Sequence, residues 1–152
     1  MGMQDYRLIL KTACASSSIW NADSIFYGNP VVLNGLHVWF QYFEPAELCR
    51  IVIDLGQIED KARGPVWRMM LESNCKNTSE FLPLLALHPG SGNAILVMHL
   101  SMEKFESHAR RPDFFRHLEE MLAPLVESWR KGNDVMSSVG QSAIPIFGGG
   151  FA

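Results

Sequence analysis

Residues 31–43 constrain the fold more than any other part of the sequence. Two runs rich in β-branched and aromatic residues, residues 31–33 and 38–43, lie on either side of Asn34-Gly35. Asn and Gly tolerate the positive φ angles of a type I′ turn, and such a dipeptide between two apolar runs is the strongest short-range signal for a β-hairpin. We therefore predict an antiparallel hairpin. A third run, residues 51–53, extends it to a three-stranded meander.

The alternation of side chains divides this meander into two faces. If the hairpin has a two-residue loop, one face is wholly apolar and suits a protein core; it carries Val31, Leu33, Leu36, Val38, Phe40 and Tyr42. The opposite face mixes polar and apolar side chains: Pro30, Val32, His37, Trp39, Gln41 and Phe43, with Val52 from the third strand. Two interpretations stay open for this second face. Either a helix or the tail of the chain covers it, or it binds an apolar partner.

The remaining helices and strands are predicted from the spacing of apolar residues and from the positions of Gly and Pro. Helical spacing predicts helices over residues 3–20 and 60–77, the latter becoming regular near Gly64-Pro65. Strands are predicted over residues 81–87 and 94–100, and Pro83 should place the first of them at a sheet edge or a bulge. A long amphipathic helix over residues 113–131, kinked at Pro124, should stop at Gly132.

Together these elements predict an α+β fold: helix, three-stranded antiparallel meander, helix, two strands, long helix. With 152 residues, the chain is long enough for one domain, which we assign to residues 1–132. Residues 133–152 are rich in Gly and Ser and are predicted to form a flexible tail.

Composition excludes several classes of function. The net charge of −3 offers no basic excess for nucleic-acid binding. No apolar run approaches the ~18 residues of a membrane span, and the N-terminus lacks the pattern of a signal peptide. The spacing of Cys14, Cys49 and Cys75 matches no zinc pattern, and their odd number argues against a disulfide framework. We expect a reduced, cytosolic protein.

Motifs for catalysis or cofactor binding are missing from the sequence. The five histidines show no ligand spacing, and no phosphate loop or nucleophile elbow is present. A nucleophilic Cys–His pair is an alternative that the sequence leaves open, since its members need not be neighbours in sequence. We expect no metal, no cofactor and no enzymatic activity.

The series of elements resembles the class I type III secretion chaperones, the Tir-chaperone (CesT-like) family, over about residues 3–131. The resemblance rests on a strand that ends in a turn glycine, Gly35, and on a later strand that ends in Leu55-Gly56. The pattern Met-Leu-Glu-Ser-Asn closes the second helix at residues 70–74, and Trp129 lies near the end of the last helix.

This resemblance implies a homodimer without enzymatic activity in the bacterial cytoplasm. Such chaperones bind the N-terminal segment of a secreted effector protein and keep it soluble and ready for secretion. Their dimer contact implies an interface here at Val66, Trp67, Met70, Leu71, Phe81 and Leu85. For the effector we assign the second face of the meander, with Val32, Trp39, Phe43 and Val52, supplemented by strand addition at a sheet edge.

Two other functions compete with this one. A small-molecule-binding or enzymatic α+β domain would use its aromatic residues to line a pocket. A structural subunit of a larger assembly would be insoluble or unstable without its partners.

Overall fold

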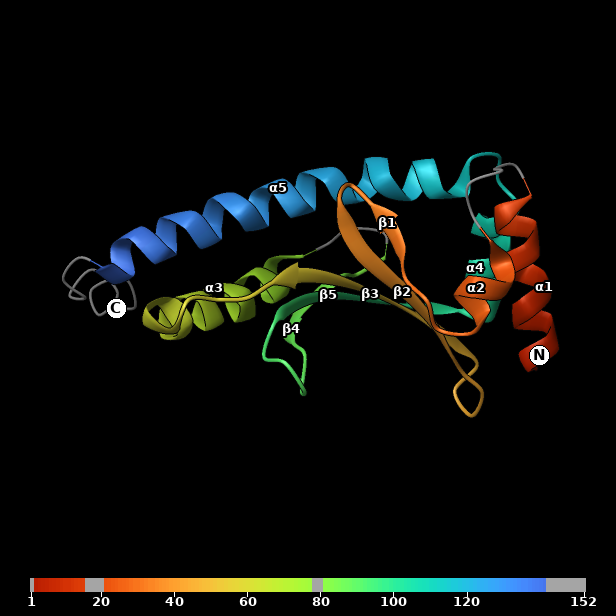
Figure 1. The fold of residues 1–152 in the computed structure, drawn as a ribbon, viewed down its shortest axis with the longest axis horizontal. Coiled ribbons are helices and arrows are strands. Elements are labelled where there is room, and N and C mark those ends of the chain that lie inside the picture. Colours follow the sequence, from red (N-terminus) through yellow and green to blue (C-terminus); the bar gives the residue numbers. More distant parts are fainter. Residues whose placement is uncertain (1, 16–20, 78–80, 142–152) are drawn as a thin grey trace.

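The computed structural model describes residues 2–15, 21–77 and 81–141. One five-stranded antiparallel sheet, in the order β1-β2-β3-β5-β4, packs against helices (Figure 1). The strands are β1 (Val31–Leu33), β2 (Leu36–Phe43), β3 (Leu48–Gly56), β4 (Leu84–Leu87) and β5 (Ala94–Ser101). The helices are α1 (Met3–Cys14), α2 (Ala22–Phe26), α3 (Arg63–Lys76), α4 (Met102–Ala109) and α5 (Phe114–Gln141), with a 3₁₀ turn, η1 (Asp60–Ala62), before α3. The predicted α+β class is confirmed, and the predicted elements follow one another as expected, with the short helices α2 and α4 in addition.

The predicted hairpin register is also confirmed. Leu33 pairs with Leu36, and Val31 with Val38. Asn34 and Gly35 adopt φ angles of 52° and 73°, which is the left-handed turn that the dipeptide favours. The Asn34 side chain also donates to the carbonyl of Glu119, at 2.9 Å, and so ties the hairpin to α5.

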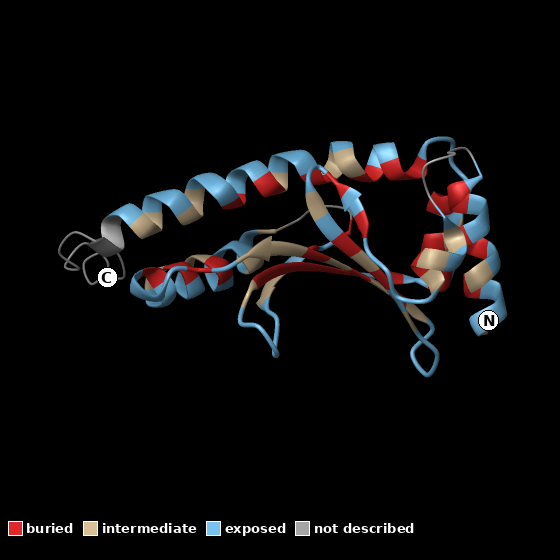
Figure 2. Cartoon of the chain, viewed as in Figure 1, coloured by how far each residue is buried: buried red, intermediate tan, exposed pale blue. Residues whose placement is uncertain are grey.

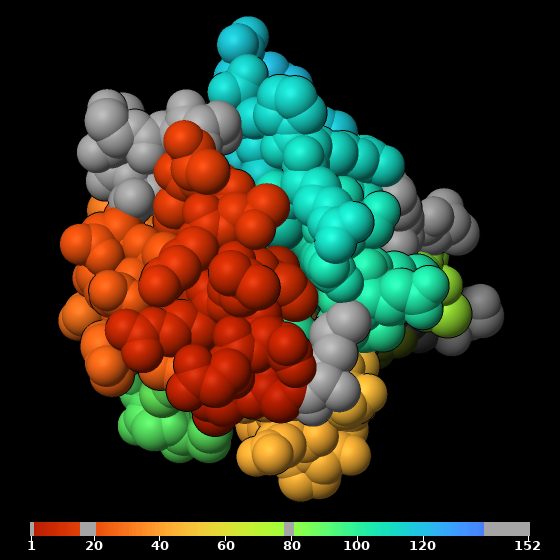
Figure 3. All heavy atoms as spheres, turned by 90° about the vertical axis from the view of Figure 1, so that its right-hand side faces the viewer, coloured from red at the N-terminus to blue at the C-terminus, as the bar shows by residue number. Residues whose placement is uncertain are grey.

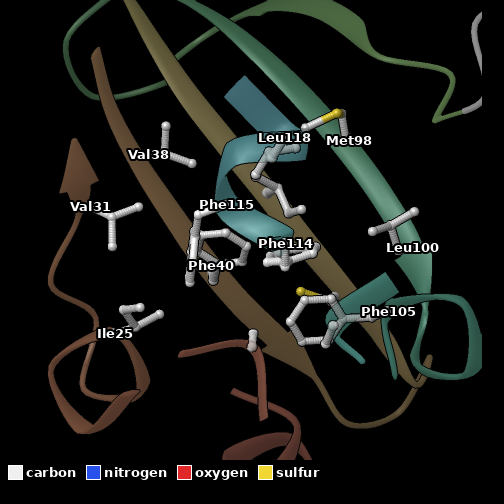
Figure 4. Close-up of a cluster of buried hydrophobic side chains, with 14 of the residues drawn as sticks. Ile25, Val31, Val38, Phe40, Met98, Leu100, Phe105, Phe114, Phe115 and Leu118 are labelled. Atoms are coloured by element: carbon white, nitrogen blue, oxygen red, sulfur yellow. The ribbon is translucent and has the colours of Figure 1, made fainter. Parts of the chain in front are cut away.

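The apolar face of the meander forms the main core, as predicted. Phe40 lies at its centre, with ring centroids 5.9 Å from Phe115, 6.2 Å from Phe105 and 6.4 Å from Phe114 (Figure 4). Strands β3 and β5 and helices α1, α2, α4 and α5 supply most of the other buried residues of this cluster. The buried side of α5 faces the rest of the molecule and its other side is exposed (Figure 2).

Helix α5 is longer than predicted, and Gly132 does not end it. Residues 133–141, predicted to begin a flexible tail, continue the helix, and residues 142–152 lie outside the described chain. A Cβ atom on Gly132 would lie 2.6 Å from Sδ of Met69, so the glycine permits a close approach of α5 to α3. Beyond it, Met136 packs on a second core cluster built around Val66, Met70 and Trp129. That packing explains why the helix continues.

The other helices differ from the predictions mainly in number and length. Helix α1 ends at Cys14, and residues 16–20 are outside the described chain. Helices α2 and α4 were not predicted. Both are short, and each is started by a side-chain cap: Asn21 accepts from the amides of Asp23 and Ser24, and Ser101 accepts from the amide of Lys104.

Strand β4 begins at Leu84, after Pro83 rather than at residue 81 as predicted, and it lies at a sheet edge. Asn74 of α3 binds its backbone. The Asn74 side chain donates to the carbonyl of Leu85 at 2.9 Å and accepts from its amide at 2.7 Å. Asn77 donates to the carbonyl of Pro83. These bonds occupy the outward-facing groups of an edge strand and so block the addition of another strand at Leu85.

Candidate functional site

The second face of the sheet, here called the open face, is covered by none of the described elements. Figure 1 shows α5 above the sheet, with α1, α2 and α4 at one end and α3 at the other. In that view the β2–β3 and β4–β5 turns both project below the sheet, away from α5. The register assigns four apolar side chains to one row across this face, from Trp39 through Val52 and Val97 to Leu84.

The exposed fractions of its side chains confirm that solvent reaches this face. Val32 is 51% exposed, Leu84 44% and Phe43 37%, while Trp39 and Val52 are half-buried. Ile95 and Val97 on the same face are buried, at 8% and 9% exposure, and belong to neither core cluster. Of the two interpretations of this face, the structure supports the uncovered one for the described residues.

Part of the open face was not predicted from the sequence. Leu84, Ile95 and Val97 were not assigned to it, because their position depends on β5 pairing with β3 rather than with a neighbour in sequence. Alternation along residues 94–101 divides that strand into two faces, but local sequence does not determine which face joins the core.

Next to the apolar row lies a polar row formed by Gln41, Arg50 and His99. Nε of Arg50 donates to Nε2 of His99 at 3.1 Å, and the guanidinium lies 4.2 Å from the centre of the Phe43 ring. Since Nε2 accepts this bond, the proton of a neutral His99 is on Nδ1. Partial desolvation, followed by the nearby Arg50 charge, lowers the pKa of His99.

Half of the residues expected at a dimer interface are inside the chain's own core. Val66, Met70 and Phe81 are 0%, 3% and 6% exposed, because α5 and the main cluster cover them. Their assignment to a subunit surface is therefore corrected. Trp67 and Leu71 are exposed on α3, at 43% and 70%, and Leu85 is half-buried.

The exposed part of α3 continues onto the neighbouring edge strand. Trp67 lines an open cavity of about 400 Å³ together with Leu87 of β4, and Leu82 and Leu84 are exposed nearby in sequence. This surface of α3 and β4 is distinct from the open face, because alternation along β4 places Leu87 and Leu84 on opposite sides of the sheet.

A second cavity of about 380 Å³ lies between α1 and α4, lined by Leu8, Ile9 and Thr12 with charged residues at its rim. Figure 3 shows that end of the molecule, where α1 lies against α4 above the β2–β3 turn. Trp67 is the one aromatic residue that lines either of these two cavities. Neither is the aromatic-lined pocket that a small-molecule-binding domain would need.

His88 has a structural role in a turn, and Cys14 and Cys49 are buried. Nδ1 of His88 accepts from the amides of Gly90 and Ser91 at 3.2 and 3.1 Å and so closes the β4–β5 turn. Burial raises the pKa of the Cys14 thiol to about 11, and burial also raises that of Cys49, so neither is a thiolate at neutral pH. Within the described ranges, no three His, Cys, Asp or Glu side chains are placed to hold a metal ion.

None of the helices in residues 2–15, 21–77 and 81–141 combines the length and apolar character needed to cross a bilayer. No protein-family model matches the chain, and no curated protein matches its sequence.

Proposed function

We propose that this protein is a secretion chaperone of the class I type III kind, which binds the N-terminal segment of a secreted effector protein. The observation that carries the proposal is the open face: a band of apolar side chains crosses four strands, and no described element covers it. Exposed apolar surface of this kind marks an interaction site in soluble proteins. Apart from the short helices α2 and α4, the order of helices and strands is the one that the resemblance implies.

The mechanism would be binding alone. Side chains of the effector segment cover Trp39, Val52 and Leu84, and each Å² of apolar surface removed from water contributes roughly 25 cal/mol. Ordering the effector chain offsets much of this gain, so a tight complex needs a long segment. Strand addition at β4 is hindered by Asn74. At the opposite edge, Val32 lies between two hydrogen-bonded pairs of the hairpin, and its backbone groups face outward.

We further propose that the chaperone is a homodimer through the exposed surface of α3 and β4. Trp67, Leu71 and Leu87 lie on that surface and suit burial against a second copy. Trp67→Glu should shift the mass in solution from dimer to monomer, as measured by light scattering. Leu8→Glu, at an exposed apolar residue of α1, is the matched control and should leave the dimer intact. A monomeric wild-type protein at micromolar concentration would contradict the dimer.

The effector proposal can be tested in the native host. The tagged chain is purified, bound proteins are identified by mass spectrometry, and the N-terminal segment of the candidate effector is then produced alone. Calorimetry should show that Trp39→Asp weakens binding of this segment by at least ~30-fold, the loss typical of an aromatic interface anchor. Leu8→Asp should bind normally. If both variants bind like wild type, the effector does not use the open face.

A further inference from the structure

Arg50 is a charged residue next to the apolar row of the open face, and no carboxylate of the described chain pairs with it. Its Nε atom donates to His99, and its Cζ atom lies over the Phe43 ring. No carboxylate of the described chain lies within ion-pair distance of Arg50, and neither of its Nη atoms makes a hydrogen bond there. The side chain is half-buried on the face that solvent reaches.

The other charged side chain of the described strands on the open face, Asp54, is already hydrogen-bonded within the chain. Asp54 accepts from the amide of Gly56 at 2.8 Å, and its two carboxylate oxygens lie 3.2 and 3.3 Å from Nδ2 of Asn93. His99 is held in its neutral form by accepting from Arg50, and its lowered pKa agrees with this. Of these groups, Arg50 is therefore the one whose outer N–H donors are without a partner in the described chain.

A partner that covers the apolar row also removes water from Arg50. Register places Val52 and Arg50 two residues apart on the same side of β3, which is roughly 7 Å along a strand. Burying an unpaired guanidinium is costly, whereas a carboxylate can accept two parallel N–H bonds from its outer edge. His99 and Phe43 hold the guanidinium in place, so little side-chain freedom remains to be lost when that pair forms.

From this we infer that Arg50 selects its partner: the open face takes an extended segment of another protein that carries a carboxylate within two residues of the apolar side chain lying over Val52. This inference rests on the proposed function, because it assumes that the open face binds a polypeptide. It adds the chemical class of the segment, apolar with an Asp or Glu, and names the residue that binds the acidic group.

The test uses a display library of short randomised peptides, selected separately against the wild type and against Arg50→Gln, Arg50→Glu and Trp39→Asp. Wild type should enrich apolar peptides that contain Asp or Glu. Arg50→Gln should still enrich apolar peptides, without the acidic residue, and Arg50→Glu should favour Lys or Arg instead. Circular dichroism of each variant establishes that it is folded before selection.

One selected peptide is then made with its acidic residue and with the matching amide. The acidic form should bind wild type about tenfold more tightly than the amide form, because hydrogen bonds to charged groups are the strong ones. That difference should vanish in Arg50→Gln and shrink in Arg50→Lys, which keeps the charge but loses the planar fork.

The outcomes separate the two proposals. Peptides that depend on Trp39 but show no acidic preference would overturn the role of Arg50 and leave the open face as a binding site; backbone carbonyls of the segment would then satisfy the guanidinium. Peptides unaffected by Trp39→Asp would overturn the site itself. A selection that returns segments of this same chain would identify the occupant as a second copy and would also contradict the inference.

Discussion

Truncating side chains on the two faces of β2 should destabilise the protein to very different extents. Phe40 is 3% exposed and contacts three phenylalanine rings from α4 and α5, so Phe40→Ala should cost about 3–5 kcal/mol of unfolding free energy. Trp39, next to it in sequence, packs on the open face against its cross-strand neighbour Val52, and Trp39→Ala should cost up to about 1 kcal/mol. The larger side chain therefore has the smaller effect.

Urea unfolding followed by far-ultraviolet circular dichroism measures both losses without relying on tryptophan fluorescence. With a slope of roughly 2 kcal/mol per molar urea, the midpoint of Phe40→Ala should fall by about 2 M and that of Trp39→Ala by less than about 0.5 M. A second pair controls for chemistry, since Val38 is 0% and Val32 is 51% exposed. Val38→Ala should be the more destabilising of the two. Equal losses within either pair would refute the assignment of an open face.

Three further predictions concern other contacts. Asn74→Ala should lose about 1–3 kcal/mol and speed hydrogen exchange at the Leu85 amide, whereas unchanged exchange would refute the clasp on β4. Gly132→Ala should stabilise the helix by up to about 1 kcal/mol in a Met69→Ala background and by less in wild type, where its Cβ meets Sδ of Met69; additive effects in urea unfolding would refute the close approach. Because folding lowers the pKa of His99, its contribution to stability should be lost as pH falls below the ordinary value of 6.5, and His99→Gln should flatten that dependence in thermal melts.

Local signals account for what could be predicted from the sequence. The register of the β1–β2 hairpin depends on Asn34-Gly35 and on alternation within a few residues, so both faces of the meander were predicted correctly. Pro83 likewise marks an edge strand through its own missing N–H. By contrast, α4 has eight residues, too few for the 3.6-residue period to stand out.

Long-range packing explains the remaining differences. Gly132 was predicted to end the last helix. Its actual role is to permit close packing against Met69 of α3, which only the tertiary structure brings near. Val66 and Met70 were assigned to an interface through the resemblance to the chaperone family, whereas the element that buries them is α5 of the same chain. The Arg50–His99 contact required the pairing of β3 with β5.

The open face can be tested most directly through the indole N–H signals of the tryptophans during titration with a selected acidic apolar peptide. Of the four tryptophans, Trp20 lies outside the described residues, Trp39 lies on the open face, Trp67 on α3 and Trp129 in the second core cluster, so the last three report on different parts of the molecule. Nuclear magnetic resonance should show that the Trp39 signal moves with peptide concentration while those of Trp67 and Trp129 stay in place. Movement of the Trp67 signal with a stationary Trp39 signal would contradict the account and place the bound segment on α3.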